Sequence, residues 1–206
     1  MQLPRAMMFV DGENLVMRYQ DSLAKGREPR EGVIHEQDCF VWHPDLTMKF
    51  FINCVRVTYY TSVVGDEPKV LEVKNQISKI NYECTPNPTR AGSIGLTGHI
   101  VPVVFKKPAK SQKTRSVDIR IVIDVMRHAF SGTIDLVYLA SGDGDYIPLI
   151  TEIMRHGTQV YVGAFSSGLS HEIPYSVDDF FDLDPIFFVD AKTAKSAAEA
   201  PKQVRS

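Results

Sequence analysis

One stretch of the sequence constrains the fold more than any other, because it changes within five residues from a strand pattern to a helix pattern. An apolar run at residues 134–140 predicts a buried strand, and Ser-Gly-Asp-Gly-Asp at residues 141–145 ends it with residues that tolerate tight turns. Apolar residues at helical spacing then predict a helix that stops before Gly157. Asp143 and Asp145 are therefore expected at the carboxyl end of a strand, where open α/β sheets place their sites.

Helix capping is the simplest alternative explanation of these two aspartates. Aspartate is among the residues most favoured at a helix N-cap, where its side chain accepts a hydrogen bond from a free backbone N–H. One cap needs only one aspartate, however, and this turn carries two. A functional interpretation therefore depends on what the rest of the chain brings to the same place.

The rest of the chain alternates strand patterns with helix patterns. Further strands are predicted at residues 6–10, 55–61 and 159–165, and an edge strand at residues 100–105, because Pro102 has no N–H for a sheet ladder. Between these strands, apolar residues at spacings of three and four predict helices. This order predicts an α/β fold with a mostly parallel sheet between two layers of helices, the three-layer α/β/α, Rossmann-like architecture.

Three other segments are expected to have structural roles only. Residues 39–42 predict an edge strand or one arm of a hairpin, and residues 81–98, with two prolines and three glycines, predict a loop. The acidic and aromatic residues 178–184 are expected to pack and to be solvated rather than to bind a ligand.

Composition and length predict the organisation of the domain and exclude several classes of protein. The 206 residues predict one domain over residues 1–190, with an insertion at about residues 25–45 and a flexible tail at residues 191–206. Three cysteines without a C-x-x-C spacing argue against a disulfide framework and a structural zinc site, which favours the cytoplasm. No signal peptide or apolar run of about 20 residues is expected, so no membrane is expected as a partner. The sequence leaves the oligomeric state open.

A basic segment is the one place where the sequence offers contacts to nucleic acid. The net charge of −2 gives no overall attraction to nucleic acid, so binding requires a local patch. Five positive charges fall within ten residues, at Lys106, Lys107, Lys110, Lys113 and Arg115. Such a run is also typical of a solvated loop, and both interpretations stand at this point.

A helix is predicted directly after the basic segment, with Ser116 as its cap and an acid in its first turn. Spacings of four and seven place Asp118 in line with Val122 and Val125, on the stripe that faces the sheet. An acid in the first turn also favours the helix dipole, which is the structural alternative.

Four carboxylates are thus expected to converge at one edge of the sheet. Asp11 ends the first strand, Asp143 and Asp145 follow a later one, and Asp118 enters from a helix. Such groups repel one another and raise one another's pKa values unless a cation intervenes. Oxygen ligands suit Mg²⁺ or Mn²⁺, and the nearby basic segment makes a phosphodiester the expected substrate, attacked by metal-activated water.

Three motifs in this order resemble those of the NYN domain, a family of the PIN-like nuclease superfamily. They are Phe-Val-Asp-Gly-Glu-Asn-Leu at residues 9–15, Ser-Val-Asp-Ile-Arg-Ile at residues 116–121 and Leu-Ala-Ser-Gly-Asp-Gly-Asp-Tyr-Ile-Pro-Leu at residues 139–149. The resemblance implies a PIN-type fold and cleavage of RNA, taken here as single-stranded, with Mg²⁺ or Mn²⁺. By position it assigns the acidic site to Asp11, Asp118, Asp143 and Asp145, and adjoining polar roles in substrate binding to Asn14 and Ser141. The family often has a lysine before its Val-Asp pair, whereas Arg115 and Ser116 precede Val117 here.

Two other functions remain open from the sequence. The first is an RNA-binding or regulatory module that keeps the fold and turns over little. The second is a phosphatase of the haloacid dehalogenase type, to whose late acidic motif residues 142–144 are similar. Those enzymes need Asp-x-Asp after the first strand, where this chain has Asp11-Gly12-Glu13.

Overall fold

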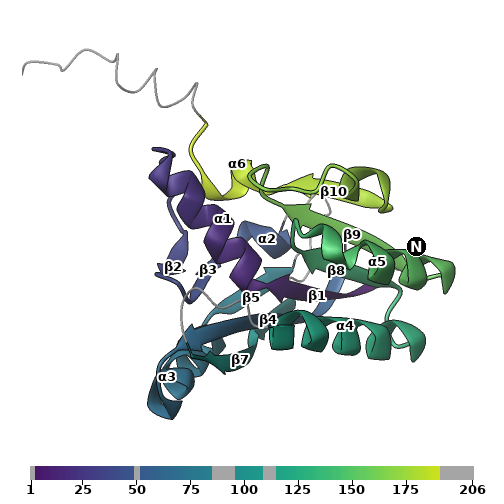
Figure 1. Ribbon diagram of the computed structural model, residues 1–206. Helices are drawn as coiled ribbons and strands as arrows, with labels where there is room; N and C mark the ends of the chain where they lie inside the picture. Colours follow the sequence, from purple (N-terminus) through teal and green to yellow (C-terminus); the bar gives the residue numbers. More distant parts are fainter. Residues whose placement is uncertain (1–2, 49–51, 85–95, 109–114, 191–206) are drawn as a thin grey trace, which may run out of the picture.

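A six-stranded, entirely parallel sheet forms the centre of the computed structural model, which describes residues 3–48, 52–84, 96–108 and 115–190. The strand order is β10-β9-β8-β1-β4-β7 (Figure 1). The strands are β1 (Arg5–Asp11), β4 (Asn53–Val64), β7 (Val101–Lys107), β8 (Leu136–Ala140), β9 (Gln159–Ala164) and β10 (Asp179–Asp182). Because all neighbours are parallel, the carboxyl ends of the strands meet at one edge of the sheet.

Helices cover both faces of this sheet, which confirms the predicted three-layer α/β/α fold. Side chains of β1 alternate between two apolar cores, with Met8 on one face and Phe9 on the other. Residues of α1 and α3 belong to the core around Met8, and residues of α4 and α5 to the core around Phe9. These helices are α1 (Gly12–Ala24), α3 (Glu67–Ser78), α4 (Arg115–Phe130) and α5 (Ile147–Arg155).

Three aspartates that follow strands begin the helical segments behind them. The side chain of Asp11 accepts a hydrogen bond from the N–H of Asn14, and the side chain of Asp66 accepts one from the N–H of Lys69. The side chain of Asp143 accepts a hydrogen bond from the N–H of Asp145 and so caps the 3₁₀ turn η1 (Gly144–Tyr146), which precedes α5. At the other end of α5, Gly157 has the left-handed φ of 89° that ends many helices, as the sequence predicts. The predicted cap at Ser116 is wrong: α4 begins at Arg115, so Ser116 is already a helical residue.

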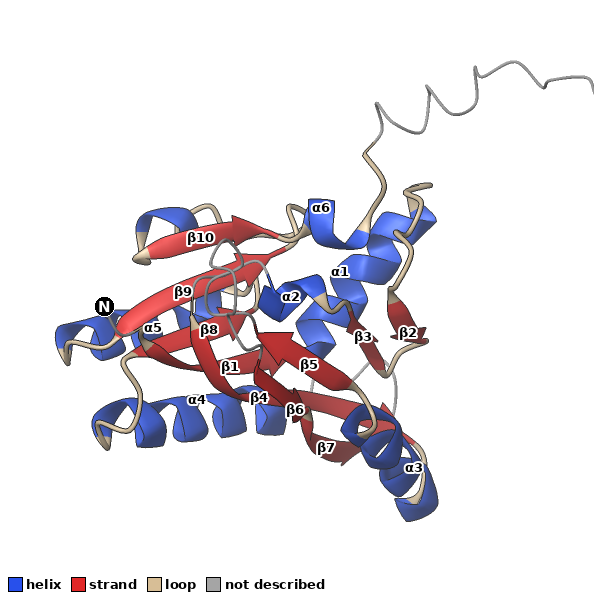
Figure 2. Cartoon of the chain, turned by 180° about the vertical axis from the view of Figure 1, so that it is seen from behind, coloured by secondary structure: helices blue, strands red, loops and turns tan. Residues whose placement is uncertain are grey.

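The segment after α1 forms a hairpin and a short helix. The hairpin consists of β2 (Ile34–Glu36) and β3 (Phe40–Trp42), and α2 (Asp45–Met48) follows it. The prediction of a hairpin arm at residues 39–42 is therefore confirmed. Figure 2 shows the hairpin beside α1, and the Tyr59 hydroxyl on β4 both donates to and accepts from the backbone of Val41. This segment is thus hydrogen-bonded to the central sheet.

Two segments differ from the sequence prediction. Residues 81–98 were expected as a loop, but β5 (Asn81–Cys84) and β6 (Leu96–His99) pair antiparallel, and the residues between them lie outside the described part. In β5, the buried residues Tyr82 and Cys84 alternate with exposed residues. Two repeats of this alternation are too few to predict a strand from the sequence. Residues 179–182 form the parallel edge strand β10. The acidic sequence of this segment does not indicate a strand, which is stabilised by its pairing with β9.

The chain ends, as far as it is described, with α6 (Asp184–Phe187), which follows β10 and a 3₁₀ turn, η2 (Ile173–Tyr175). The tail predicted at residues 191–206 lies outside the described residues. In the described ranges, no helix combines the length and the apolar character needed to cross a membrane.

Candidate active site

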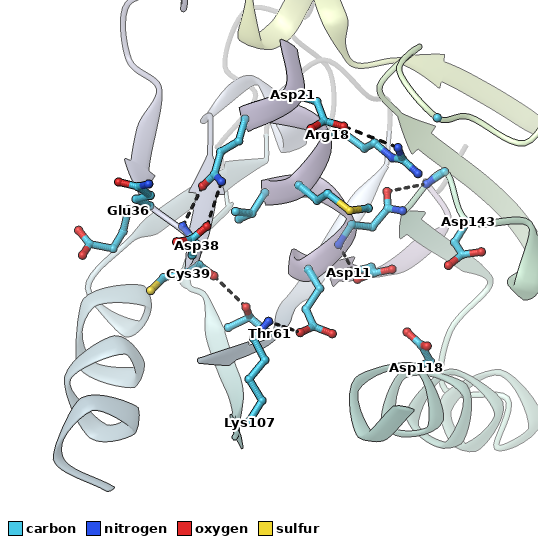
Figure 3. Close-up of a pocket in the computed structure, with 18 of the residues that line it drawn as sticks. Asp11, Arg18, Asp21, Glu36, Asp38, Cys39, Thr61, Lys107, Asp118 and Asp143 are labelled. Carbon is cyan, nitrogen blue, oxygen red and sulfur yellow. Dashed lines mark hydrogen bonds and ion pairs between the residues drawn. The ribbon is translucent and has the colours of Figure 1, made fainter. Parts of the chain in front are cut away.

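A cleft of about 920 Å³ opens at the carboxyl edge of the sheet, beside the ends of β1 and β8. Three of the four predicted acids line it: Asp11 at the end of β1, Asp118 in the first turn of α4 and Asp143 after β8. Figure 3 shows Asp118 and Asp143 on one side of Asp11 and the β2–β3 hairpin on the other. Acids from three segments that are far apart in the sequence therefore share one cavity.

Asp11 is the most deeply buried of these acids. Its carboxylate accepts hydrogen bonds from the backbone N–H of Asn14 (3.1 Å) and from the hydroxyl of Ser141 (2.9 Å). Burial raises the pKa of Asp11 to about 7; the two hydrogen bonds oppose this shift, and the charges of Asp118 and Glu13 add to it. In the absence of a cation, the protein therefore holds a proton on Asp11 up to about neutral pH.

Asn14 and Ser141 connect the ends of β1 and β8. The Asn14 side-chain oxygen accepts a hydrogen bond from the N–H of Gly142 (3.2 Å), and the Ser141 oxygen accepts one from the N–H of Asp143 (3.2 Å). Asn14 also lines the cleft, whereas Ser141 is completely buried. Ser141 is thus placed to hold the acids rather than to reach a substrate.

Asp143 caps the turn that follows it and also faces the cleft. It lines the cleft, and its Oδ1 atom also accepts a hydrogen bond from the N–H of Asp145 (3.0 Å). Asp145 is exposed and does not line the cleft. The Asp143 side chain therefore faces the cavity, and the backbone N–H of Asp145 holds that side chain in position.

Tyr146 is a site residue that sequence reasoning missed. Its hydroxyl donates a hydrogen bond to Oδ1 of Asp118 (3.3 Å), and its ring is buried in the core under α4 and α5. Burial raises its pKa far above the usual range, and the negative charges of Asp11 and Asp118 add to this. The sequence feature that could have indicated this role is the position of Tyr146, a phenol directly after the acidic turn and before a run of aliphatic residues.

Glu13 is a second residue that the sequence analysis did not assign. Its carboxylate accepts hydrogen bonds from the Ser62 hydroxyl and from the Lys107 ammonium group (3.0 Å). The side chains of this ion pair are only 14 % exposed for Lys107 and 19 % for Glu13, and both line the cleft. The sequence feature that could have indicated a role for Glu13 is its position, two residues after Asp11 at the start of a helix.

The basic segment is only partly described. Lys107 lines the cleft, Lys106 is exposed at the end of β7, and Arg115 is exposed at the start of α4. Lys110 and Lys113 lie outside the described residues. Of the three cations of this segment that the structure describes, Lys107 lines the cleft and Lys106 and Arg115 do not.

The carboxylate oxygens in the cleft are the kind of ligand that a hard divalent cation prefers. Asp11, Asp118 and Asp143 offer oxygen atoms only, and burial disfavours the charged form of Asp11 in the absence of a positive partner. Within the described ranges, no group of three or more His, Cys, Asp or Glu side chains is placed so that it could hold a metal ion. Mg²⁺ commonly retains several waters, so carboxylates in such a cleft could hold it directly or through those waters.

Comparison with known proteins agrees with this architecture. No curated protein matches the chain. A crystal structure of a protein of unknown function from Vibrio parahaemolyticus is similar to it in fold, with a TM-score of 0.56 and 17 % identity, over 92 % of this chain and 100 % of that one. The NYN domain family matches residues 5–184, which include all three motifs and every strand of the central sheet. Since this match covers most of its length, the chain belongs to the NYN domain family, within the PIN-like nuclease superfamily.

Proposed function

We propose that this protein is a metal-dependent endoribonuclease that hydrolyses RNA phosphodiester bonds. The observation that carries the proposal is the convergence of Asp11, Asp118 and Asp143 in one cleft, with burial and neighbouring charge raising the pKa of Asp11 to about 7. A protein gains nothing in stability from such crowding, so the arrangement is expected to serve a ligand with positive charge.

Mg²⁺ or Mn²⁺, when bound, would activate a water molecule and neutralise charge that develops on the phosphate oxygens. Asp11, Asp118 and Asp143 would hold the ion, with Asp145 supporting Asp143 through its backbone N–H. Ser141 and Asn14 orient Asp11 and the turn after β8, and Tyr146 orients Asp118. Because these partners are buried, the carboxylates keep one arrangement before the substrate arrives.

Single-stranded RNA is the substrate that we propose. Lys107 in the cleft would contact phosphates, together with the other cations of the basic segment, Lys106, Lys110, Lys113 and Arg115. Asn14, which also lines the cleft, would contact the RNA strand there. We place the protein in the cytoplasm, because Cys39, Cys54 and Cys84 are all free thiols.

The test is a cleavage assay on an end-labelled single strand, in Mn²⁺ and in chelator. We expect internal cuts that need metal and that Asp143→Asn slows by orders of magnitude. Asp66→Asn is the control, because Asp66 caps α3 in the same way and does not line the cleft. Equal rates for Asp143→Asn and the parent would contradict the proposal.

Two other results would replace the proposal with an alternative. Tight binding of RNA without cleavage would indicate a binding or regulatory module. Hydrolysis of a small chromogenic phosphate ester, without cleavage of RNA, would indicate a phosphatase.

A further inference from the structure

Arg18 places a guanidinium group in the wall of the cleft that holds the three acids. It lies on α1, lines the cavity and keeps 28 % of its side chain exposed. Figure 3 shows its guanidinium group and Lys107 on opposite sides of Asp11. The cleft therefore has a cation on each side of its deepest acid.

The hydrogen bonding of Arg18 is incomplete. Its Nε atom is buried and has no hydrogen-bond partner within the described part of the chain. Its one ion pair there joins Nη1 to the half-exposed Asp21 at 3.9 Å, which is too long for a hydrogen bond. By contrast, Arg27 and Arg120 donate directly to Asp184 and Asp124, at 2.5 and 2.8 Å. Because Nε is covered by the protein, the donors of Arg18 that a group from outside could reach are those on Nη1 and Nη2.

Gly168 creates the space that Arg18 occupies. A Cβ atom added at Gly168 would overlap the guanidinium group, and the φ of 71° at this position also favours glycine. The same segment is bonded to the acidic turn, because the N–H of Ser170 donates to the carbonyl of Gly142 at 3.0 Å. The guanidinium group is therefore held beside the turn that carries Asp143.

We propose that Arg18 binds a phosphate group of the RNA strand, next to the phosphodiester that is cut. A guanidinium group presents several N–H donors in one plane, which matches two oxygens of a phosphate. With Lys107 on the other side of Asp11, the strand would cross the acids between two cations. This inference rests on the proposed function for its ligand, and it adds a contact outside the basic segment.

The test measures binding of a labelled single-stranded oligoribonucleotide in chelator, across a range of salt concentrations. Arg18→Met is expected to weaken binding about tenfold and to lower the slope of log affinity against log salt by about 1. Arg18→Lys keeps the charge and loses the planar donors, so it should keep the slope and still bind more weakly. In metal, Arg18→Met should raise KM for cleavage and leave kcat within about threefold, because no reacting atom is lost.

Arg155→Met is the matched control, since Arg155 is an exposed arginine in an i,i+3 ion pair (3.7 Å to Glu152) away from the cleft. Thermal melts check that all variants are folded. The same affinity, slope and KM for Arg18→Met and Arg155→Met would overturn the inference, as would a parent protein that binds no RNA. RNA binding that depends on Arg18, in a parent that does not cleave, would refute the nuclease and keep the contact between Arg18 and an RNA phosphate.

Discussion

The hydroxyl of Ser141 donates a hydrogen bond of 2.9 Å to the Oδ2 atom of Asp11, across 130 positions of the chain. The same oxygen accepts the N–H of Asp143, so one buried side chain joins acids that follow the neighbouring parallel strands β1 and β8. The spacing of these acids is therefore set by protein groups.

The burial of Asp11 predicts a pH dependence of stability in metal-free solution. The pKa is raised from 3.8 to about 7, so between these values the unfolded state is ionised while the folded state keeps its proton. The contribution of Asp11 to stability is thus greatest below about pH 4, falls as the pH rises towards 7 and is constant above that. Its slope is at most about 1.4 kcal/mol per pH unit.

Asp11→Asn removes this titration. Urea melts of the parent and the variant in chelator, at pH 5 and pH 7, should show the variant gaining relative stability at the higher pH. The same difference at both pH values would show that Asp11 is ionised in the folded protein.

The two roles of Asp143 can be separated by metal. In chelator, Asp143→Ala should change stability little, because loss of a cap worth about 1 kcal/mol opposes relief of charge repulsion. In Mn²⁺ at a hundredfold excess over its dissociation constant, the parent should gain about 2.7 kcal/mol, and Asp143→Ala much less. Asp66→Ala, which removes only a cap, should respond to metal like the parent. Equal responses in all three proteins would exclude Asp143 from a metal site.

Tyr146 and Tyr60 offer a matched pair of substitutions. Each is a buried tyrosine that donates a hydrogen bond to an aspartate of α4, Tyr146 to Asp118 (3.3 Å) and Tyr60 to Asp124 (3.1 Å). Only Asp118 lines the cleft. Loss of either hydroxyl should cost roughly 1 kcal/mol of stability.

Cleavage should separate the two variants. Tyr146→Phe should lower kcat several-fold, because Asp118 loses the group that orients it, and Tyr60→Phe should keep the kcat of the parent. A similar kcat for both variants would restrict Tyr146 to a structural role.

The ion pair between Glu13 and Lys107 predicts energetic coupling between α1 and the edge strand β7. Both side chains are mostly buried, so removal of one charge leaves the other poorly compensated. Glu13→Gln, Lys107→Met and the double variant should give an interaction energy of roughly 0.5 to 3 kcal/mol in urea melts. An interaction energy near zero would show that this ion pair does not couple α1 to β7.

Local patterns in the sequence were enough to predict the fold and the position of Asp11 and Asp143. Strand periodicity, glycine turns and helix spacing depend on neighbours a few residues apart, and parallel strands necessarily bring their carboxyl ends to one edge. The same reasoning failed for residues 81–98 and 179–182, because short strands with weak alternation are stabilised by their pairing partners.

The contacts that complete the site were decided by the tertiary structure. Glu13 meets Lys107 across 94 positions, Tyr146 meets Asp118 across 28, and Arg18 fits against Gly168 only because α1 passes that segment. Such contacts depend on strand order and on how each helix packs, which no local pattern contains. The sequence by itself determined which residues end the strands, and the packing of the layers decided which of them face the cleft and what holds them there.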